Sequence, residues 1–181
     1  TGRYGVLSFN GNKIVTTGGG GAILCGDEDG QRAKHITTTA KQPHPYEFIH
    51  DEVGFNYRMP NLNAALGCAQ LERLDGYLAD KRALAAGYRA LFADSDYIFC
   101  DEPTENGSKS NFWLCAVACP TADARQTLLE QTNAQGVMTR PFWQLMTDTP
   151  MYGGAPTGPI PNAGWAHDHV VMLPSSPVGP V

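Results

Sequence analysis

The sequence contains no long apolar run and no strong excess of charge. No hydrophobic stretch approaches the roughly 20 residues that a membrane span requires, and the first residues lack the charged and then apolar pattern of a secretory signal. The formal net charge is only -5, which argues against a surface for nucleic acid. Hydrophobic residues make up 42% of the chain, so a disordered tail is not indicated either. We therefore expect a soluble, cytoplasmic protein whose partners include neither nucleic acid nor a membrane.

Cysteine and histidine spacings that are typical of metal sites are also missing. The five cysteines form no C-x-x-C pair and are odd in number, which argues against both a zinc knuckle and a disulfide framework. We expect reduced thiols in the core, Cys115 and Cys119 among them, because free cysteine is usually buried. His167 and His169 are two residues apart, as metal ligands on a strand can be, but no cysteine pair or acidic cluster lies near them. A loop or interface role is favoured for both, and no metal is predicted.

The first part of the chain is predicted to alternate short strands with loops. A length of 181 residues suits one domain, or one domain and a small part of another. The predicted elements are strands at 4–9 and 22–25, a polar glycine-rich loop between them, a helix opening at Asp27, and an irregular segment at 37–51. A long loop inside a compact chain often carries function.

Helices are predicted in the middle of the chain. Pro60 suits the first position of a helix whose apolar residues recur at helical spacing as far as Leu74. A second helix is predicted over 77–92, with Gly76 at the bend between the two. The remaining predicted elements are strands at 97–100, 112–119 and 169–173, a helix from Thr121 or Ala122 to about Gln135, and an aperiodic stretch at 151–164.

One lysine lies in a setting that suits covalent catalysis. Residues 8–13 read S-F-N-G-N-K and residues 16–21 read T-T-G-G-G-G, which places Lys13 on an irregular turn near hydroxyls and small residues. An enzyme that uses pyridoxal 5'-phosphate (PLP) needs a lysine amine for a Schiff base and donors for the phosphate, some of which glycine-rich turns supply. On these residues alone, an exposed lysine beside a flexible loop is the more common explanation.

A second motif makes the interpretation specific. Residues 54–67 read G-F-N-Y-R-M-P-N-L-N-A-A-L-G, and residues 70–75 read Q-L-E-R-L-D. This run strongly resembles a signature of the nucleotide-sugar aminotransferases of the DegT/StrS group, and the Lys13 segment resembles the same family's S-F-x-x-x-K-x-x-x-x-G-x-G-G segment. Both motifs stand in the family's order and spacing. The segments T-R-P-F-W at 139–143 and L-P-S at 173–175 extend the resemblance over nearly the whole chain.

The resemblance implies a PLP-dependent transfer of an amino group, with glutamate as donor, to a keto group of a nucleotide-linked deoxysugar. Lys13 matches the Schiff-base lysine, which would also move the proton between the substrate carbon and the cofactor. Ser8 matches a residue that holds the cofactor phosphate. Asn56 matches an asparagine that reaches the phosphate of the neighbouring subunit, which implies a homodimer with its sites at the interface.

Four further residues are candidates for binding substrate. Tyr57 and Arg58 lie beside Asn56, and the alternative is that they anchor the start of the next helix and pack the interface. Arg140 and Trp143 suit a nucleotide or a sugar by charge and stacking, although a tryptophan is commonly part of a core.

Three positions depart from the pattern of many relatives. Asn10 and Met146 stand where histidine is common, and Gly19 stands where glutamate is common. Together with the motifs S-F-N-G-N-K and R-P-F-W, these three departures resemble a subgroup that makes 4-amino sugars on the way to bacillosamine or legionaminic acid. Some family members carry histidine in place of the lysine and act as dehydratases, so the retained Lys13 favours transamination.

Only part of the family's fold is predicted here. In relatives, the aromatic that stacks on the cofactor and the acid that pairs with its pyridine nitrogen precede the lysine, whereas twelve residues precede Lys13 and none is acidic. The predicted class is therefore α/β, a fragment of an aspartate-aminotransferase-like fold (fold type I). Residues 1–60 are expected to end the PLP-binding large domain, 61–94 to form connector helices, and 95–181 to form a truncated small α/β domain. The fragment alone is expected to be inactive, and the alternative is a truncated or degenerate relative that assembles or binds without catalysis.

Overall fold

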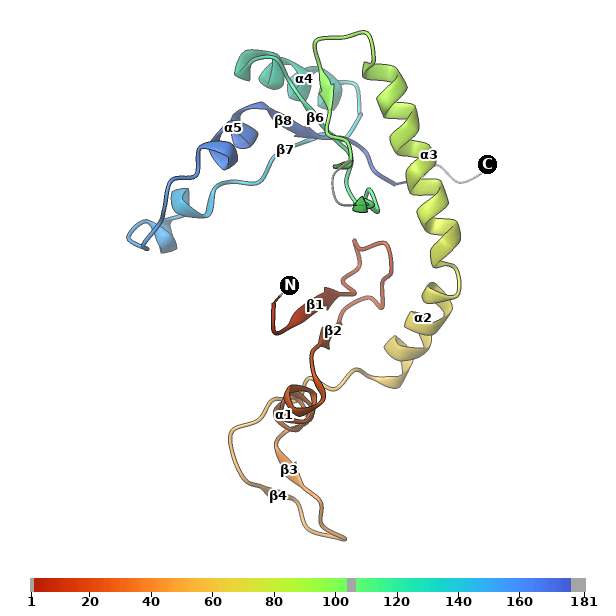
Figure 1. Cartoon of the computed structure of the whole chain (residues 1–181), viewed down its shortest axis with the longest axis vertical. Helices are drawn as coiled ribbons and strands as arrows, with labels where there is room; N and C mark the ends of the chain where they lie inside the picture. The colour runs from red at the N-terminus through yellow and green to blue at the C-terminus, as the bar shows by residue number, and fades with distance from the viewer. Residues whose placement is uncertain (1, 104–106, 177–181) are drawn as a thin grey trace. The chain divides into compact units, whose positions relative to one another are not determined.

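The computed structural model describes residues 2–103 and 107–176, which fall into two compact units, Thr1–Asp75 and Gly76–Val181 (Figure 1). The three-part division with boundaries near residues 60 and 95 stays a prediction. Within the described ranges, no helix has both the length and the apolar character that a membrane span needs.

The first unit opens with a two-stranded antiparallel ribbon. β1 (Gly5–Ser8) pairs with β2 (Gly21–Leu24), so that Ser8 lies opposite Gly21 (Figure 1). Only glycine fits at position 21, because a Cβ there would lie 2.4 Å from the carbonyl oxygen of Leu7 on the other strand. Both strands were predicted, and the loop that joins them carries Lys13.

A helix and a short hairpin complete the first half of this unit. α1 (Asp27–Thr37) begins with acidic residues and ends with basic ones, an arrangement that complements the helix dipole. β3 (Lys41–Gln42) then pairs antiparallel with β4 (Ile49–His50), and the hairpin extends beyond α1 (Figure 1). The prediction that residues 37–51 are irregular was therefore wrong in part. Pro43 and Pro45 lie between the two strands, where the backbone needs no ladder hydrogen bond.

Two helices follow, close to where the sequence predicted them. α2 (Asn61–Leu71) starts directly after Pro60, and α3 (Leu74–Phe92) follows after a two-residue turn. Gly76 lies inside α3, so the prediction that it marks the bend was wrong. The boundary between the two units falls within α3.

An antiparallel sheet forms the centre of the second unit. Its strand order is β5-β6-β8-β7, with the bounds Ile98–Phe99, Ala116–Ala118, Val170–Met172 and Arg140–Pro141. Val117 of β6 lies opposite Val171 of β8, and both side chains are fully buried. Around them the core consists of Ala85, Phe99, Phe112, Cys115, Cys119 and Leu173.

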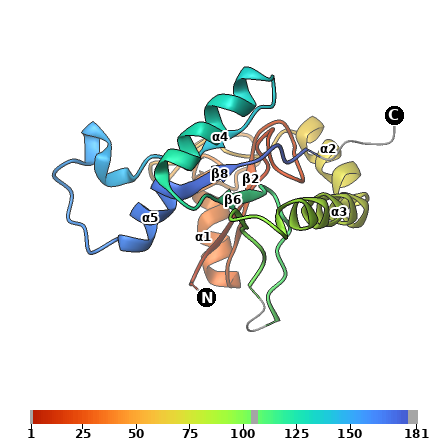
Figure 2. The same ribbon diagram turned by 90° about the horizontal axis from the view of Figure 1, so that it is seen from above.

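Helices cover this core and connect its strands. α4 (Ala122–Ala134) packs Leu128 and Leu129 against the core. The helix also contacts β8 (Figure 2). Its predicted cap is present, since Thr121 Oγ1 accepts a hydrogen bond from Ala124 N at 3.1 Å. Two short 3-10 turns, η2 (Met146–Asp148) and η3 (Pro150–Tyr152), and then α5 (Pro161–His169) lead into β8.

Three sequence predictions for this unit need correction. Strand 112–119 is shorter than predicted, because Phe112 adopts a φ of 46° and the strand itself comprises Ala116–Ala118. The aperiodic stretch at 151–164 ends in the first turn of α5. Cys115 and Cys119 are buried as expected, whereas Cys100 is exposed rather than in a core, and so is Cys68 in the first unit.

A buried lysine holds the segment that follows β8. Lys81 of α3 donates from Nζ to Trp113 O at 3.0 Å and also to Ser175 O. Tyr88, two turns further along α3, donates from its hydroxyl to Pro174 O at 2.8 Å. Burial lowers the pKa of Lys81, and the two carbonyl groups compensate for the loss of water.

Candidate active site

Lys13 lies in the loop between β1 and β2, hereafter the Lys13 loop (residues 9–20). Both ends of the loop are fixed, because Phe9 N donates to Gly20 O at 2.9 Å and Thr17 N donates to Phe9 O at 3.0 Å. Lys13 N donates to Asn10 O at 3.0 Å and so closes a turn, and Lys13 is half-buried. The structure therefore places this lysine on a closed and hydrogen-bonded loop.

Ser8 lies at the end of β1, directly before the same loop. Its side chain is exposed, and Asn10 N lies 3.4 Å from Ser8 Oγ. Ser8 Oγ is the acceptor in that contact, which leaves the hydroxyl hydrogen able to donate to a phosphate oxygen. Ser8 thus ends β1, and Lys13 lies in the loop that follows it.

Asn56 lies in a segment that runs along the end of α1. Phe55 N donates to Ile36 O at 2.7 Å, Tyr57 N donates to Thr37 O at 2.9 Å, and Asn56 forms a single β-bridge with Thr38. The backbone of the second motif is therefore fixed on both sides of Asn56, while its side chain is exposed.

The two motifs meet around one hollow of about 320 Å³ in the first unit. Its walls come from the glycines at 19–21 on one side and from residues 56–60 with Asn63 on the other. Asn56, Tyr57 and Arg58 all line it. Motifs that are more than thirty residues apart in the sequence thus share a concave surface, which is the usual form of a ligand site.

Neither Ser8 nor Lys13 lines this hollow. The structure brings Asn56 to the glycine-rich end of the Lys13 loop and leaves the lysine on another part of that loop. Asn56 and Lys13 of the same chain therefore do not line a common hollow.

Arg140 and Trp143 belong to the second unit. Arg140 lies in β7 and is exposed, with Nη1 3.3 Å from Thr139 O. Trp143 packs edge-on against Phe142, with ring centroids 5.5 Å apart, and remains 54% exposed. The alternative of a core tryptophan is thereby wrong, and the indole face is accessible for stacking.

His167 and His169 lie in α5 rather than on a strand or in a loop. His167 Nδ1 lies 3.1 Å from Trp143 O, and the His169 ring stacks on Trp165 at 4.9 Å. Residues two apart on a helix do not face each other, so the two imidazoles do not form a common site. Both residues make contacts within the second unit, so the loop position that was favoured is wrong, while an interface role stays a prediction.

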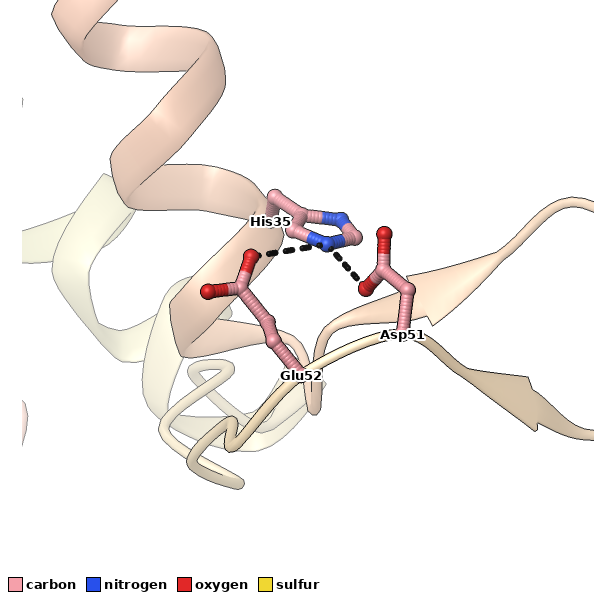
Figure 3. A group of neighbouring side chains, drawn as sticks. All are labelled: His35, Asp51 and Glu52. Carbon is pink, nitrogen blue, oxygen red and sulfur yellow. Dashed lines mark hydrogen bonds and ion pairs between the residues drawn. The ribbon is translucent and has the colours of Figure 1, made fainter.

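One cluster of metal-ligand type was not found from the sequence. His35 Nε2 lies 2.7 Å from Asp51 Oδ1 and 3.4 Å from Glu52 Oε1 (Figure 3). Arg32 binds both carboxylate oxygens of Glu52, and Gln42 Nε2 donates to Asp51 Oδ2 at 2.6 Å. Because these donors already bind the two carboxylates, the cluster is an ion-pair network that ties α1 to the β3–β4 hairpin.

This network predicts a loss of stability in acid. The Arg32 guanidinium lowers the pKa of Glu52 below its usual value of 4.5. A carboxylate with a lowered folded-state pKa stabilises the fold fully above pH 4.5, and this contribution is lost as the pH falls through the folded value. The Asp51 amide donates to Ala40 O and reports on the hairpin. In Glu52→Gln its hydrogen exchange should be faster than in the wild type at pH 7, and its protection factor should depend less on pH below 4.5.

The matched control for that measurement is Glu47→Gln on the same hairpin, whose carboxylate lies 3.8 Å from His44 rather than against a guanidinium. If both variants show the same pH dependence as the wild type, the Arg32 pair does not stabilise the hairpin.

These residues fit part of a PLP site. Lys13 offers an amine, Ser8 offers a hydroxyl donor, and the glycine-rich turn offers backbone amides. Gly18 and Gly20 adopt φ values of 77° and 109°, which favour glycine, so this turn depends on them. The set suits covalent attachment and phosphate binding, whereas residues 1–12 contain no acid for the pyridine nitrogen.

The fold and these motifs define a class, the PLP-dependent aminotransferases of fold type I. PseC of Helicobacter pylori, an aminotransferase involved in the biosynthesis of pseudoaminic acid, superimposes with a TM-score of 0.85 at 21% identity. The match covers 95% of this chain and 47% of that one. The predicted fold class, part of an aspartate-aminotransferase-like α/β fold, is confirmed.

Within this class, the chain belongs to the DegT/DnrJ/EryC1/StrS aminotransferase family, whose sequence model matches residues 1–178. EpsN of Bacillus subtilis (strain 168), whose name describes a pyridoxal phosphate-dependent aminotransferase, is 31% identical over 155 residues, 85% of this chain and 39% of that protein. GDP-perosamine synthase of Escherichia coli O157:H7 is 30% identical over 159 residues, 83% of this chain and 41% of that protein. The chain thus spans less than half the length of the relatives it matches.

Proposed function

We propose that the full-length protein is a cytoplasmic PLP-dependent aminotransferase that moves an amino group from L-glutamate to a keto group of a nucleotide-linked deoxysugar. Family membership over residues 1–178 carries this proposal. The retained Lys13, on a closed loop directly after Ser8, supports it, because transamination needs a fixed amine beside phosphate donors.

Two residues of the Lys13 segment carry the chemistry. Lys13 binds the cofactor through Nζ, and the Ser8 hydroxyl donates a hydrogen bond to its phosphate. When bound, PLP withdraws electrons from the substrate carbon and so makes its proton acidic. The Lys13 amine would serve as the general base that takes this proton and as the general acid that returns it.

The proposed assembly is a homodimer in which Asn56 of each chain serves the site of the other. The position of Asn56 supports this, since it lines a hollow with the glycine-rich turn while neither Ser8 nor Lys13 lines it. Tyr57 and Arg58 line the same hollow and are proposed to contact substrate there.

The second unit is proposed to contribute to nucleotide or sugar binding. Arg140 supplies charge and the exposed Trp143 supplies a stacking face. Assignment to the 4-amino sugars on the way to bacillosamine or legionaminic acid stays a prediction.

The test is to add PLP to the purified full-length protein, record the visible spectrum, reduce with borohydride and sequence the modified peptide by mass spectrometry. A visible band that borohydride removes, with the cofactor mass on Lys13, is the expected result. The alternative, a non-catalytic relative with an assembly or binding role, predicts no band and no modified peptide from the full-length protein.

A further inference from the structure

Three residues on one face of α2 lie against the Lys13 loop. Asn63 Nδ2 donates to Thr17 O at 2.5 Å, and Gln70 Oε1 accepts from Thr16 N at 3.4 Å. Between them, Gly67 leaves room for the loop, because a Cβ there would lie 3.0 Å from Thr17 Cγ2. The spacing of four and then three residues puts all three on the same side of the helix.

Thr17 is the point at which the loop is anchored. It is 2% exposed, whereas the other residues of the Lys13 loop are exposed or half-buried. Its hydroxyl donates to Gly19 O, and its amide donates to Phe9 O at 3.0 Å. The hydroxyl, the amide and the carbonyl of Thr17 are thus all hydrogen-bonded. These bonds fix the backbone four residues after Lys13.

We propose that Asn63 and Gln70 are positioning residues that hold the Lys13 loop so that the lysine amine meets the cofactor. This inference rests on the proposed function. The two side chains act on Lys13 through the backbone of Thr16 and Thr17, since the described contacts join them to the loop there.

A fixed backbone matters for this reaction because bond formation requires the attacking nitrogen and the cofactor carbon to approach closely in one orientation. Displacement of a reacting group by about 1 Å can cost on the order of 100-fold in rate. Asn63 and Gln70 bind the backbone of two neighbouring residues of the loop, so removing either side chain frees the chain near Lys13, while the ends of the loop stay joined by the β1–β2 ladder.

The experiment measures how fast the visible band of the lysine-bound cofactor appears when PLP is added to full-length protein from which the cofactor has been removed. Asn63→Ala and Gln70→Ala are expected to slow it by about 10- to 100-fold. Asn61→Ala is the matched control, because Asn61 is an exposed asparagine at the start of the same helix. Denaturant midpoints of all variants show the folded fraction.

Two conservative variants separate positioning from general damage. Asn63→Asp keeps the shape but loses the N–H donor that Thr17 O needs, so it should be as slow as Asn63→Ala. Gln70→Glu keeps the oxygen that accepts from Thr16 N, so it should react at nearly the wild-type rate. A role confined to folding predicts no such asymmetry once rates are corrected for the folded fraction.

Equal rates in Asn63→Ala and Asn61→Ala, or rates that depend only on the folded fraction, would overturn the inference. Absence of a band in the wild type would instead refute the proposed function. In that case an amine-acylating reagent still reports the position of Lys13. The ratio of Lys13 to Lys34 labelling should then change in Asn63→Ala and not in Asn61→Ala. An unchanged ratio in Asn63→Ala would refute the positioning role.

Discussion

Replacing Lys13 with alanine in the full-length protein is expected to abolish the visible band of the lysine-bound cofactor. The substitution removes the amine that forms the covalent bond and the base that moves the substrate proton. Amino transfer should fall by at least about 1,000-fold, within the range that positioned acid–base groups contribute. Visible spectra and single-turnover rates, recorded at the same PLP concentration, measure the two effects separately.

Lys34→Ala is the control for Lys13→Ala. Lys34 is exposed near the end of α1, so its removal should leave both the band and the rate as in the wild type. Persistence of the band in Lys13→Ala, with the cofactor mass on another lysine, would show that the motif has been assigned to the wrong residue.

The two motifs found in the sequence account for most of the candidate site. The S-F-N-G-N-K segment predicted a lysine on an irregular turn, and the structure shows Lys13 in a closed loop after Ser8. Nothing in either motif indicated that the loop rests on α2. The side-chain amide of Asn63 contacts Thr17, 46 positions earlier in the chain, and that of Gln70 contacts Thr16, 54 positions earlier. Sequence periodicity carries no information on such contacts.

Elements with strong local signals were predicted well, and those that depend on tertiary contacts were not. α2, α3 and α4 follow from helical spacing of apolar residues and a threonine cap. β3 and β4 have two residues each, so their pairing gives no alternation that a sequence reveals. Gly76 looked like a bend because glycine disfavours helix, yet α3 includes it at a cost of only about 1 kcal/mol.

The His35, Asp51 and Glu52 network was missed for the same reason. Its members lie on α1 and just after β4, and only the hairpin brings them together (Figure 3). A sequence that gives no signal for the hairpin gives none for the network.

Gly54→Ala should have the largest effect on the stability of the first unit. A Cβ at this position would lie 2.4 Å from the carbonyl carbon of Thr39 and 2.5 Å from Ala40 N, both of them backbone atoms that cannot rotate away. Ala40 is fully buried, and Thr39 and Ala40 already hold positive φ values of 68° and 49°. We expect a loss of about 3 kcal/mol in the free energy of unfolding, at the upper end of the range for overpacking.

The same substitution should disturb the second motif before the protein unfolds. Phe55 and Tyr57 donate to carbonyls at the end of α1, and a shift of Gly54 away from the backbone of residues 39 and 40 pulls these bonds apart. Hydrogen exchange of the two amides should therefore accelerate more than that of Thr17, whose amide bond to Phe9 lies within the Lys13 loop. PLP binding should weaken as Asn56 leaves its place in the hollow.

Gly76→Ala provides the matched control of opposite sign. No atom lies within 4 Å of a Cβ at this position, and Gly76 is inside α3, so alanine should stabilise by about 0.5–1 kcal/mol. Urea denaturation of both variants in the full-length protein measures the difference. A Gly54→Ala protein with the wild-type midpoint and wild-type exchange at Phe55 and Tyr57 would mean that the close approach to residues 39 and 40 does not hold Asn56 in place.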